Sequence, residues 1–345
     1  MTKESIPNLL LISSPQTSKN DNLPLTDLLA VEDFRNIVQQ FDRALRLPEY
    51  GSLHPDRQIA TVVYSVAAHT AFVNGLTSRV EPGLLDSTKH RFGLRFMGHS
   101  IGEMAALIEA GVCDIQTMAW MLNEREKITE APLRSGLRLM AAVVGIDTAS
   151  FEQNMDSLEA YVGEIAKVHL ANLNTPRQVV VAVEVFKGEA EPVLARLATG
   201  LSALSPRAQL IRLKAQNAFH SAAMKGEEGL YMRAISPFLD RKHFKDPPEG
   251  VIYSPMLPGW IDTRGEAVDV TQHILTRRVQ FTKAAKEAQR IPDLVGIVTA
   301  DFIDITPDLM RRNIGNGIPI WNIKNQATLE QAIEGTSEKI LQQAA

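Results

Sequence analysis

The sequence predicts an α/β protein, in which a mostly parallel sheet is covered by helices and a small α+β unit is inserted. Short apolar runs alternate with helical patterns over residues 1–135, and this alternation is typical of a parallel sheet covered on both faces. A glycine-flanked serine, Ser100, stands between a strand-like run and a helix-like run. Residues 136–213 follow the order β-α-β-β-α-β, which is the ferredoxin-like split motif. We therefore expect a discontinuous large domain over residues 1–135 and 214–345, and a small domain over 136–213.

The elements before the inserted unit follow from apolar periodicity and from the turn residues that bound each run. Leu9 to Ile12 is an apolar run that ends at Ser13-Ser14-Pro15, which indicates a buried strand followed by a turn. The helix predicted over residues 58–72 is apolar on nearly every side, as a buried helix is. The remaining elements predicted here are an amphipathic helix at 26–46, a strand at 94–97 and a helix at 104–110 that stops at Gly111.

The inserted unit is predicted from a change of character after about Ser135, where β-branched apolar runs become frequent. Its predicted elements are a strand at 139–144, a helix at 151–161, strands at 168–172 and 178–183, a helix at 189–198 and a strand at 209–213. The chain would then return to the large domain, and the cleft between the two domains is a natural place for a substrate.

The most informative motif is Gly98-His99-Ser100-Ile101-Gly102 followed by Glu103, a G-x-S-x-G nucleophile elbow of the kind found in α/β-hydrolase-like folds. The glycines allow a sharp turn that presents the serine hydroxyl at a helix N-terminus. The backbone N–H of Ile101 is then placed to stabilise an oxyanion. The alternative, a plain loop with two glycines, is disfavoured because the flanking runs fit a strand and a helix.

Composition excludes several classes of function. The 345 residues are 45% hydrophobic, enough for a substantial core, and the net charge of −4 argues against nucleic-acid binding. Cys113 is the single cysteine, so no internal disulfide forms. We find no signal-peptide core and no membrane span, and expect a cytoplasmic protein. The eight histidines have no partners at ligand spacing, so we expect no metal site.

A serine nucleophile needs a base, and His220 is the best candidate because it follows the last strand of the inserted unit, where the chain re-enters the large domain. A histidine at such a position is also compatible with a purely structural role. His99 lies on the elbow itself, but its position points it away from the attack geometry, and we expect it beside the substrate. His169 falls in a predicted strand and is interpreted as structural.

Several motifs in consistent order resemble the malonyl-CoA:acyl-carrier-protein transacylase family and the acyltransferase domains of polyketide synthases. The resemblance covers roughly residues 9–310, and residues 98–103 match the family's G-H-S-x-G-E signature in full. The other matching residues are Gln58, Arg125 at 25 positions after the serine, Asn174-Thr175-Pro176-Arg177-Gln178, Phe219 before His220, and Gln280 in Val279-Gln280-Phe281.

The resemblance implies a role for each of these residues. Arg125 would bind the malonyl carboxylate through its fork of donors, whereas without the resemblance it reads as a solvated arginine. Phe219 would narrow the pocket beside the acyl C2 carbon, with core packing as an equal alternative. Gln58 would lie near the substrate, and the Gln280 carbonyl would orient His220. The family's P-G-Q-G-S-Q turn is replaced by Pro15-Gln16-Thr17-Ser18-Lys19, so Gln16 is retained as an oxyanion donor without its glycines.

The implied function is ping-pong transfer of a malonyl or similar dicarboxylic acyl unit from CoA to the phosphopantetheine thiol of an acyl carrier protein, in fatty acid or polyketide biosynthesis. Malonyl-CoA is then a substrate, and no cofactor is needed. Two alternatives stay open. One is an acyl-carrier-protein hydrolase of the same fold, which the carboxylate-binding role of Arg125 disfavours. The other is a non-catalytic scaffold.

Overall fold

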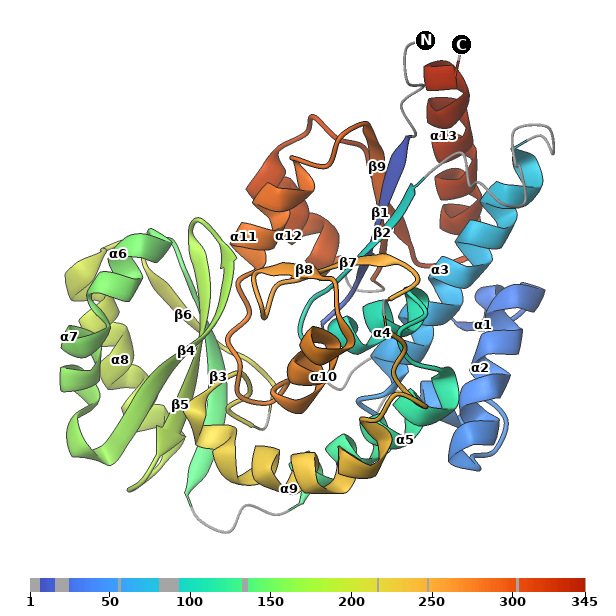
Figure 1. The fold of residues 1–345 in the computed structure, drawn as a ribbon. Helices are drawn as coiled ribbons and strands as arrows, with labels where there is room; N and C mark the ends of the chain where they lie inside the picture. The colour runs from blue at the N-terminus through green and yellow to red at the C-terminus, as the bar shows by residue number, and fades with distance from the viewer. Residues whose placement is uncertain are drawn as a thin grey trace.

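A six-stranded sheet forms the centre of the larger part of the protein (Figure 1). The computed structural model describes residues 7–15, 25–54, 57–80, 93–131, 136–215, 217–246, 248–301 and 304–344. The strand order is β10-β9-β1-β2-β7-β8, with parallel pairing throughout except between β7 and β8. The strands are β1 (Asn8–Ser13), β2 (Gly93–Gly98), β7 (Val251–Ser254), β8 (Gly259–Ile261), β9 (Leu294–Ala300) and β10 (Ile320–Ile323).

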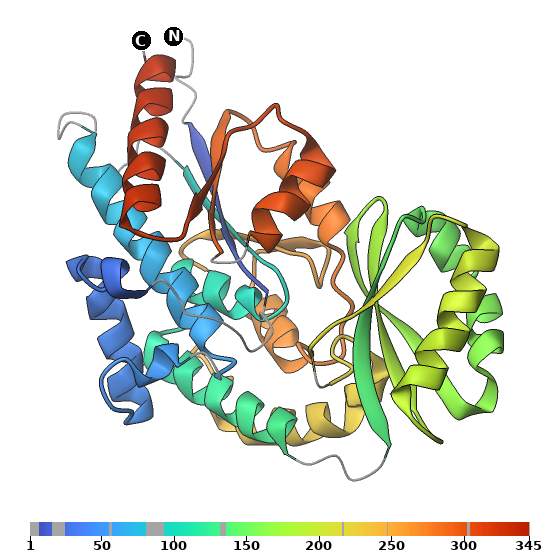
Figure 2. The same cartoon turned by 180° about the vertical axis from the view of Figure 1, so that it is seen from behind.

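Helices cover both faces of this sheet. On one face lie α3 (Ala60–Arg79), α4 (Gly102–Glu109) and α13 (Gln326–Ala344), while α11 (Phe281–Ala288) and α12 (Ile305–Ile314) lie on the other, as Figures 1 and 2 show. The remaining helices of this part are α1 (Leu25–Leu28), α2 (Glu32–Leu45), α5 (Ile115–Glu130), α9 (Lys225–Ile235) and α10 (Arg264–Gln272).

A second, four-stranded antiparallel sheet lies beside the first, in the order β4-β5-β3-β6. Its strands are β3 (Leu137–Val144), β4 (Ala166–Thr175), β5 (Gln178–Val185) and β6 (Gln209–Arg212). The helices α6 (Thr148–Gln153), α7 (Met155–Val162) and α8 (Ala190–Leu204) cover its outer face (Figure 1). The chain order and strand order together are those of the ferredoxin-like motif.

The inner face of the small sheet packs on the large part of the protein. On β5, Val179, Val181 and Val183 belong to the core shared with the helices of the small sheet. Val180 and Ala182 alternate with them and belong to the larger core. Since successive side chains of a strand point to opposite faces, β5 is buried on both sides, which explains its unbroken apolar sequence.

The predicted combination of a mostly parallel sheet with a small antiparallel sheet is confirmed, and two predicted helices are divided. The expected helix at 26–46 forms as α1 and α2, and the one at 151–161 forms as α6 and α7. The second break falls at Asn154, which leaves helical geometry at φ −106° while its side-chain Nδ2 donates to the Ser150 carbonyl at 2.8 Å. Such local side-chain bonds compete with helix continuation.

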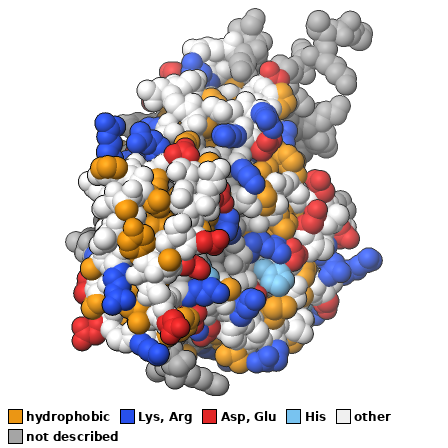
Figure 3. Space-filling model, turned by 90° about the vertical axis from the view of Figure 1, so that its left-hand side faces the viewer, with side chains coloured by type: hydrophobic (Ala, Val, Ile, Leu, Met, Phe, Trp, Pro, Cys, Tyr) orange, Lys and Arg blue, Asp and Glu red, His pale blue; other side chains and the backbone are white. Residues whose placement is uncertain are grey.

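Among the helices described, none is long and apolar enough to cross a membrane. The face shown in Figure 3 carries acidic and basic side chains intermixed, in keeping with the small net charge of −4. Among the described residues, this face shows no single broad basic area of the kind that nucleic-acid binding uses.

Candidate active site

Ser100 occupies a sharp turn between β2 and α4, where the sequence predicts a nucleophile elbow. Its φ of 57° lies in the left-handed region, which is strained for a serine. The flanking glycines are required by close approach of the backbone. A Cβ on Gly98 would lie 2.1 Å from the Glu103 nitrogen, and one on Gly102 would lie 2.4 Å from the Ser13 carbonyl oxygen. The glycines thus let β1, β2 and α4 meet closely enough to expose the serine hydroxyl.

His220 faces Ser100, although 120 residues separate them in the chain. The Ser100 Oγ lies 2.6 Å from His220 Nε2, and the opposite ring nitrogen, Nδ1, lies 2.9 Å from the Arg277 carbonyl oxygen. With Nδ1–H donating to that carbonyl, Nε2 is left as the acceptor for the serine hydroxyl. The arrangement is that of a nucleophile paired with a base.

The carbonyl that orients His220 belongs to Arg277 and not to Gln280, so the prediction for Gln280 is wrong. Gln280 is the N-cap of α11, and its carbonyl accepts the backbone N–H groups of Lys283 at 3.0 Å and Ala284 at 3.2 Å. A carbonyl committed to the first turn of a helix points along the helix axis, away from a side chain outside it. Arg277, three residues earlier, precedes the helix and keeps its carbonyl available.

Burial keeps both histidines of the site neutral. It lowers the pKa of His220 to about 3, against the opposing effect of the Arg277 carbonyl. It also lowers the pKa of His99 to about 4. His99 Nε2 lies 3.0 Å from the Asn174 side-chain oxygen, and its Nδ1 is buried with no hydrogen-bond partner among the described residues. A neutral imidazole at His220 is the form that accepts a proton.

Arg125 is fully buried, and none of the carboxylates in the described residues forms an ion pair with it. It lies on α5 with 1% of its surface exposed, and its Nη1 donates to the Gln58 side-chain oxygen. In the described part of the chain no ion pair reaches it, and its Nε has no hydrogen-bond partner. Burial lowers the pKa of the guanidinium to about 10, so it stays charged at neutral pH. A buried cation with free donors is a site for an anion.

Two more side chains surround this guanidinium. The Phe219 ring lies beneath it, with the guanidinium carbon 4.9 Å from the ring centroid. Gln58 is fixed from its other end, where Nε2 donates to the Thr129 hydroxyl at 2.9 Å. The neighbouring acid, Glu126, is already paired with Arg57 at 2.6 Å. The structure thus brings Gln58, Arg125 and Phe219, three residues singled out in the sequence, into one cluster.

A pocket of about 320 Å³ lies between the two sheets and holds this chemistry. Ser100, His99, His220, Gln58 and Phe219 line it, and Arg125 lies directly behind the last two. The small sheet supplies an apolar wall that includes Met140, Ala142 and Val180. A ligand bound here would therefore present an apolar portion to the small sheet and its polar end to Gln58.

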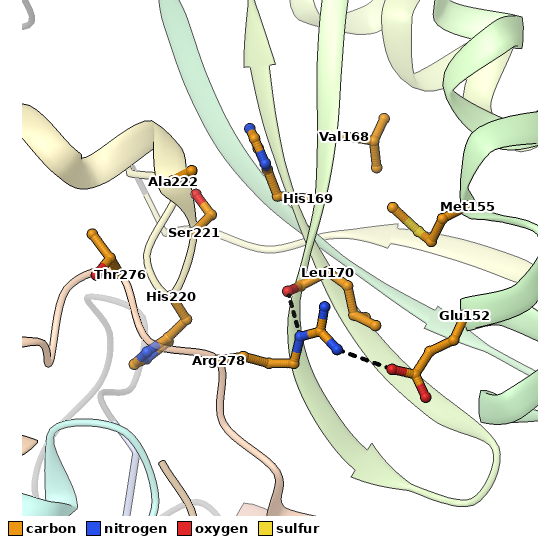
Figure 4. Close-up of a pocket in the computed structure, with 10 residues that line it drawn as sticks. All are labelled: Glu152, Met155, Val168, His169, Leu170, His220, Ser221, Ala222, Thr276 and Arg278. Atoms are coloured by element: carbon orange, nitrogen blue, oxygen red, sulfur yellow. Dashed lines mark hydrogen bonds and ion pairs between the residues drawn. The ribbon is translucent and has the colours of Figure 1, made fainter. Parts of the chain in front are cut away.

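A larger pocket of about 480 Å³ opens on the other side of His220 (Figure 4). Arg278 crosses it, with Nε donating to the Leu170 carbonyl at 3.2 Å and Nη1 lying 2.9 Å from the Glu152 carboxylate. The imidazole of His220 points away from its centre in Figure 4. Neither Ser100 nor Arg125 lines this pocket, so its size does not make it the active site. His169 lines it from β4.

The structure describes only one of the two predicted oxyanion donors, the backbone N–H of Ile101. Among the residues that the structure describes, no acceptor receives the backbone N–H of Ile101, which leaves it available at the start of α4. Gln16, the second predicted donor, lies outside the described residues. Over the described ranges, no group of three or more His, Cys, Asp or Glu side chains is arranged to hold a metal.

Comparison with known proteins gives a consistent group of relatives. No protein-family profile matches the chain. The malonyl CoA-acyl carrier protein transacylase of Bacillus subtilis is 25% identical over 246 residues, covering 70% of this chain and 71% of that protein. The protein of that name from Escherichia coli K12 is 38% identical over 85 residues, about a quarter of each chain.

Solved structures show the same fold. The acyl-carrier-protein S-malonyltransferase of Burkholderia pseudomallei superposes with a TM-score of 0.76 at 17% identity, over 95% of this chain and 99% of that one. A malonyl-transacylase solved in complex with its type II polyketide acyl carrier protein superposes with a TM-score of 0.73 at 19% identity, over 95% and 99% of the two chains.

Proposed function

Since the chain belongs to the malonyl-CoA:acyl-carrier-protein transacylase family, we propose that it moves a malonyl or similar dicarboxylic acyl unit from CoA to a carrier-protein thiol. The proposal rests on the closeness of a reactive serine to a buried arginine. A serine–histidine pair 2.6 Å apart lines the same pocket as Gln58 and Phe219, which hold a buried arginine with no ionic partner in the described chain. A nucleophile and a free cation together suit an acyl group that ends in a carboxylate.

In the proposed first half-reaction, Ser100 becomes acylated. The Ser100 oxygen attacks the thioester carbonyl carbon of malonyl-CoA while its proton passes to His220 Nε2. The resulting oxyanion accepts the Ile101 N–H, a contribution of about 3 kcal/mol, with Gln16 as the proposed second donor. The carbon–sulfur bond then breaks, and the CoA thiolate takes the proton from His220 as it leaves.

The second half-reaction reverses the first with a different thiol. The phosphopantetheine thiol of the carrier protein gives its proton to His220 and attacks the acyl-serine carbonyl carbon. When the ester bond breaks, Ser100 recovers its proton from His220 and the malonyl group leaves on the carrier. The Arg277 carbonyl holds Nδ1–H throughout, so the same ring nitrogen serves both half-reactions.

We propose that the substrate carboxylate replaces the Gln58 oxygen on Arg125. The guanidinium lies behind Gln58 and Phe219. A carboxylate that enters between these two side chains would give Arg125 a charged acceptor in place of the neutral Gln58 oxygen. Hydrogen bonds to charged groups are roughly twice as strong as neutral ones. Phe219, held beneath the guanidinium, would then border the carbon next to the carboxylate and restrict branching there.

The rival function is hydrolysis of acyl groups on a carrier protein, in which water takes the place of the carrier thiol. Incubating the protein with malonyl-CoA and a phosphopantetheinylated carrier, and following the mass of the carrier, separates the two. Transfer predicts a carrier heavier by one malonyl group. Free malonate without a loaded carrier would establish hydrolysis instead.

We also propose that the large domain is α/β-hydrolase-like, which the elbow between β2 and α4 supports. The carrier, if acidic, would meet basic side chains near the pocket, and Arg311 and Arg312 on α12 are candidates because the same helix carries the pocket residue Leu309. The sequence also offers the basic segment Lys89-His90-Arg91 as a candidate for binding the carrier, and this segment lies outside the described residues. A transfer rate that falls with added salt in the wild type, and less so in Arg312→Ala, supports this docking.

A further inference from the structure

We infer that Asp269 is a positioning residue, which holds the side chain of Arg277 and thereby fixes the carbonyl that orients His220. Asp269 lies on α10, one helical turn before His273. The inference rests on the proposed role of His220 as the base. It concerns how that base is aimed, a question separate from which acyl group the enzyme transfers.

The carbonyl in question belongs to a tight turn at residues 273–277. The backbone N–H of Arg277 donates to the His273 carbonyl at 2.9 Å, and that of Thr276 donates to the same carbonyl at 3.2 Å. This turn contacts the loop of the base at two points. The Leu275 carbonyl accepts the backbone N–H of His220 at 2.7 Å, and the Arg277 carbonyl accepts the imidazole Nδ1–H at 2.9 Å.

Two carboxylates from two helices hold the side chains of this turn. Asp269 binds the Arg277 guanidinium in bidentate fashion, at 2.5 and 3.0 Å, and its Oδ1 lies 3.5 Å from His273 Nε2. Glu228, on α9, accepts the Thr276 hydroxyl and lies 3.3 Å from His273 Nδ1. A bidentate arginine–carboxylate pair fixes direction as well as distance, so it sets the orientation of the residue that bears it.

The next residue is held from the opposite side. The Arg278 guanidinium reaches the small sheet, where its Nε donates to the Leu170 carbonyl and its Nη1 pairs with Glu152 (Figure 4). The peptide between Arg277 and Arg278 is therefore flanked by two side chains anchored to different parts of the protein. Rotation of that peptide would have to move one of the two anchors, so its carbonyl stays aimed at His220.

The exposure of the pair separates a positioning role from a stabilising one. The Arg277 and Asp269 side chains are 26% and 40% exposed, and ion pairs at such positions contribute little to stability. Removing the carboxylate should therefore leave the fold intact. What it should change is the direction of the Arg277 carbonyl, and with it the tautomer and the aim of His220.

The experiment measures how fast Ser100 reacts with a fluorophosphonate ester, a reagent that phosphonylates activated serines and releases fluoride. We expect Asp269→Ala to react about tenfold more slowly than wild type, part of the roughly 100-fold or more that a positioned base contributes. The matched control, Glu287→Ala, removes a half-buried carboxylate on α11 that pairs with the exposed Arg290 at 2.5 Å, and it should react within about twofold of wild type. The melting temperatures of both variants should stay close to that of wild type.

Two further readouts separate positioning from a structural effect. In histidine-labelled protein, the ring Nδ1–H resonance, assigned by its loss in His220→Ala, should shift in Asp269→Ala and not in the control. The double variant Asp269→Ala/Arg277→Met should react no more slowly than Asp269→Ala alone, because the two residues act as one unit.

Three results would overturn the inference: a labelling rate of Asp269→Ala within twofold of wild type, an unmoved Nδ1–H resonance, or losses that multiply in the double variant. A wild-type protein in which Ser100 does not label would overturn it too, since His220 would then not activate the serine. The probe needs no acyl-CoA. A protein that labels at Ser100 but takes no malonyl group therefore contradicts the proposed function, while its variants still decide the role of Asp269.

Discussion

Replacing Arg125 by methionine should separate malonyl transfer from acyl transfer in general. Methionine keeps much of the volume of the buried side chain but removes its charge and donors. Loss of two hydrogen bonds to a carboxylate costs about 3–5 kcal/mol, and the lower figure applies because Gln58 already supplies one acceptor to Arg125 in the free protein. About 3 kcal/mol corresponds to a loss of about 100-fold in kcat/KM for malonyl-CoA.

Acetyl transfer should respond differently, because an acetyl group presents no carboxylate. We expect kcat/KM for acetyl-CoA to change by less than about threefold in Arg125→Met. The assay is the rate of carrier loading, read by mass, with each acyl-CoA in turn. Lys127→Met, which removes an exposed charge from the same helix, should leave both rates unchanged. Equal losses with malonyl-CoA and acetyl-CoA would refute the carboxylate-binding role.

Arg125→Met also tests how the buried charge affects the stability of the folded protein. Burial lowers the pKa of Arg125 to about 10, so the protein interior disfavours the charged guanidinium. The hydrogen bond to Gln58 and the contact with the Phe219 ring offset part of that cost. Replacing such a buried charge by an apolar side chain of similar volume is often neutral or stabilising, so the free energy of unfolding of Arg125→Met should equal or exceed that of wild type in urea titrations. A fall of several kcal/mol would show that the guanidinium holds the fold together.

Three other predictions concern the pocket, the base and the elbow. Phe219→Ala opens the space beside the acyl carbon next to the carboxylate. In competition experiments read by mass, the ratio of methylmalonyl to malonyl loading should therefore rise about tenfold. An unchanged ratio would mean that Phe219 only packs in the core. Because the pKa of His220 is lowered to about 3, it stays neutral in the folded protein, and acylation should show no inflection near pH 6.5. Below pH 6.5 the unfolded chain then binds more protons than the folded protein, so the free energy of unfolding falls as the pH drops from 6.5 toward 3. In urea titrations, His220→Gln should reduce the slope of this fall by about 1.4 kcal/mol per pH unit. An unchanged slope would contradict the lowered pKa of His220. Gly102→Ala places a Cβ 2.4 Å from a backbone oxygen and should abolish acylation in the mass assay, whereas Gly226→Ala, which meets nothing within 4 Å, should not; full activity of the first variant would contradict the elbow geometry.

The elbow was predictable from the sequence because its geometry is local. Gly98 and Gly102 are where a Cβ would strike the backbone of neighbouring elements, and their spacing around Ser100 encodes the turn. The strands of the small sheet were predictable for a similar reason, because β-branched runs such as Gln178–Val185 suit a sheet buried on both faces. The break at Asn154 was missed because a helical period continues across it while one side chain caps the turn.

The orienting carbonyl could not be found in this way. Every residue has a backbone carbonyl, so nothing in the sequence distinguishes Arg277 from Gln280 as the partner of His220. The difference appears only in space, where Gln280 begins α11 and Arg277 does not. The charge of Arg125 is a similar case. Only the family resemblance implied a carboxylate-binding role for it, and its lack of an ionic partner among the described residues is visible only in the folded protein.

In the proposed mechanism, Ser100 carries the acyl group between the two thiols. Intact-mass analysis after incubation with malonyl-CoA alone detects this acyl-serine. We expect an increase of about 86 Da, one malonyl group, on the wild-type protein at Ser100, and no increase on Ser100→Ala. A wild-type mass that does not change, or an adduct that persists in Ser100→Ala, would contradict this mechanism.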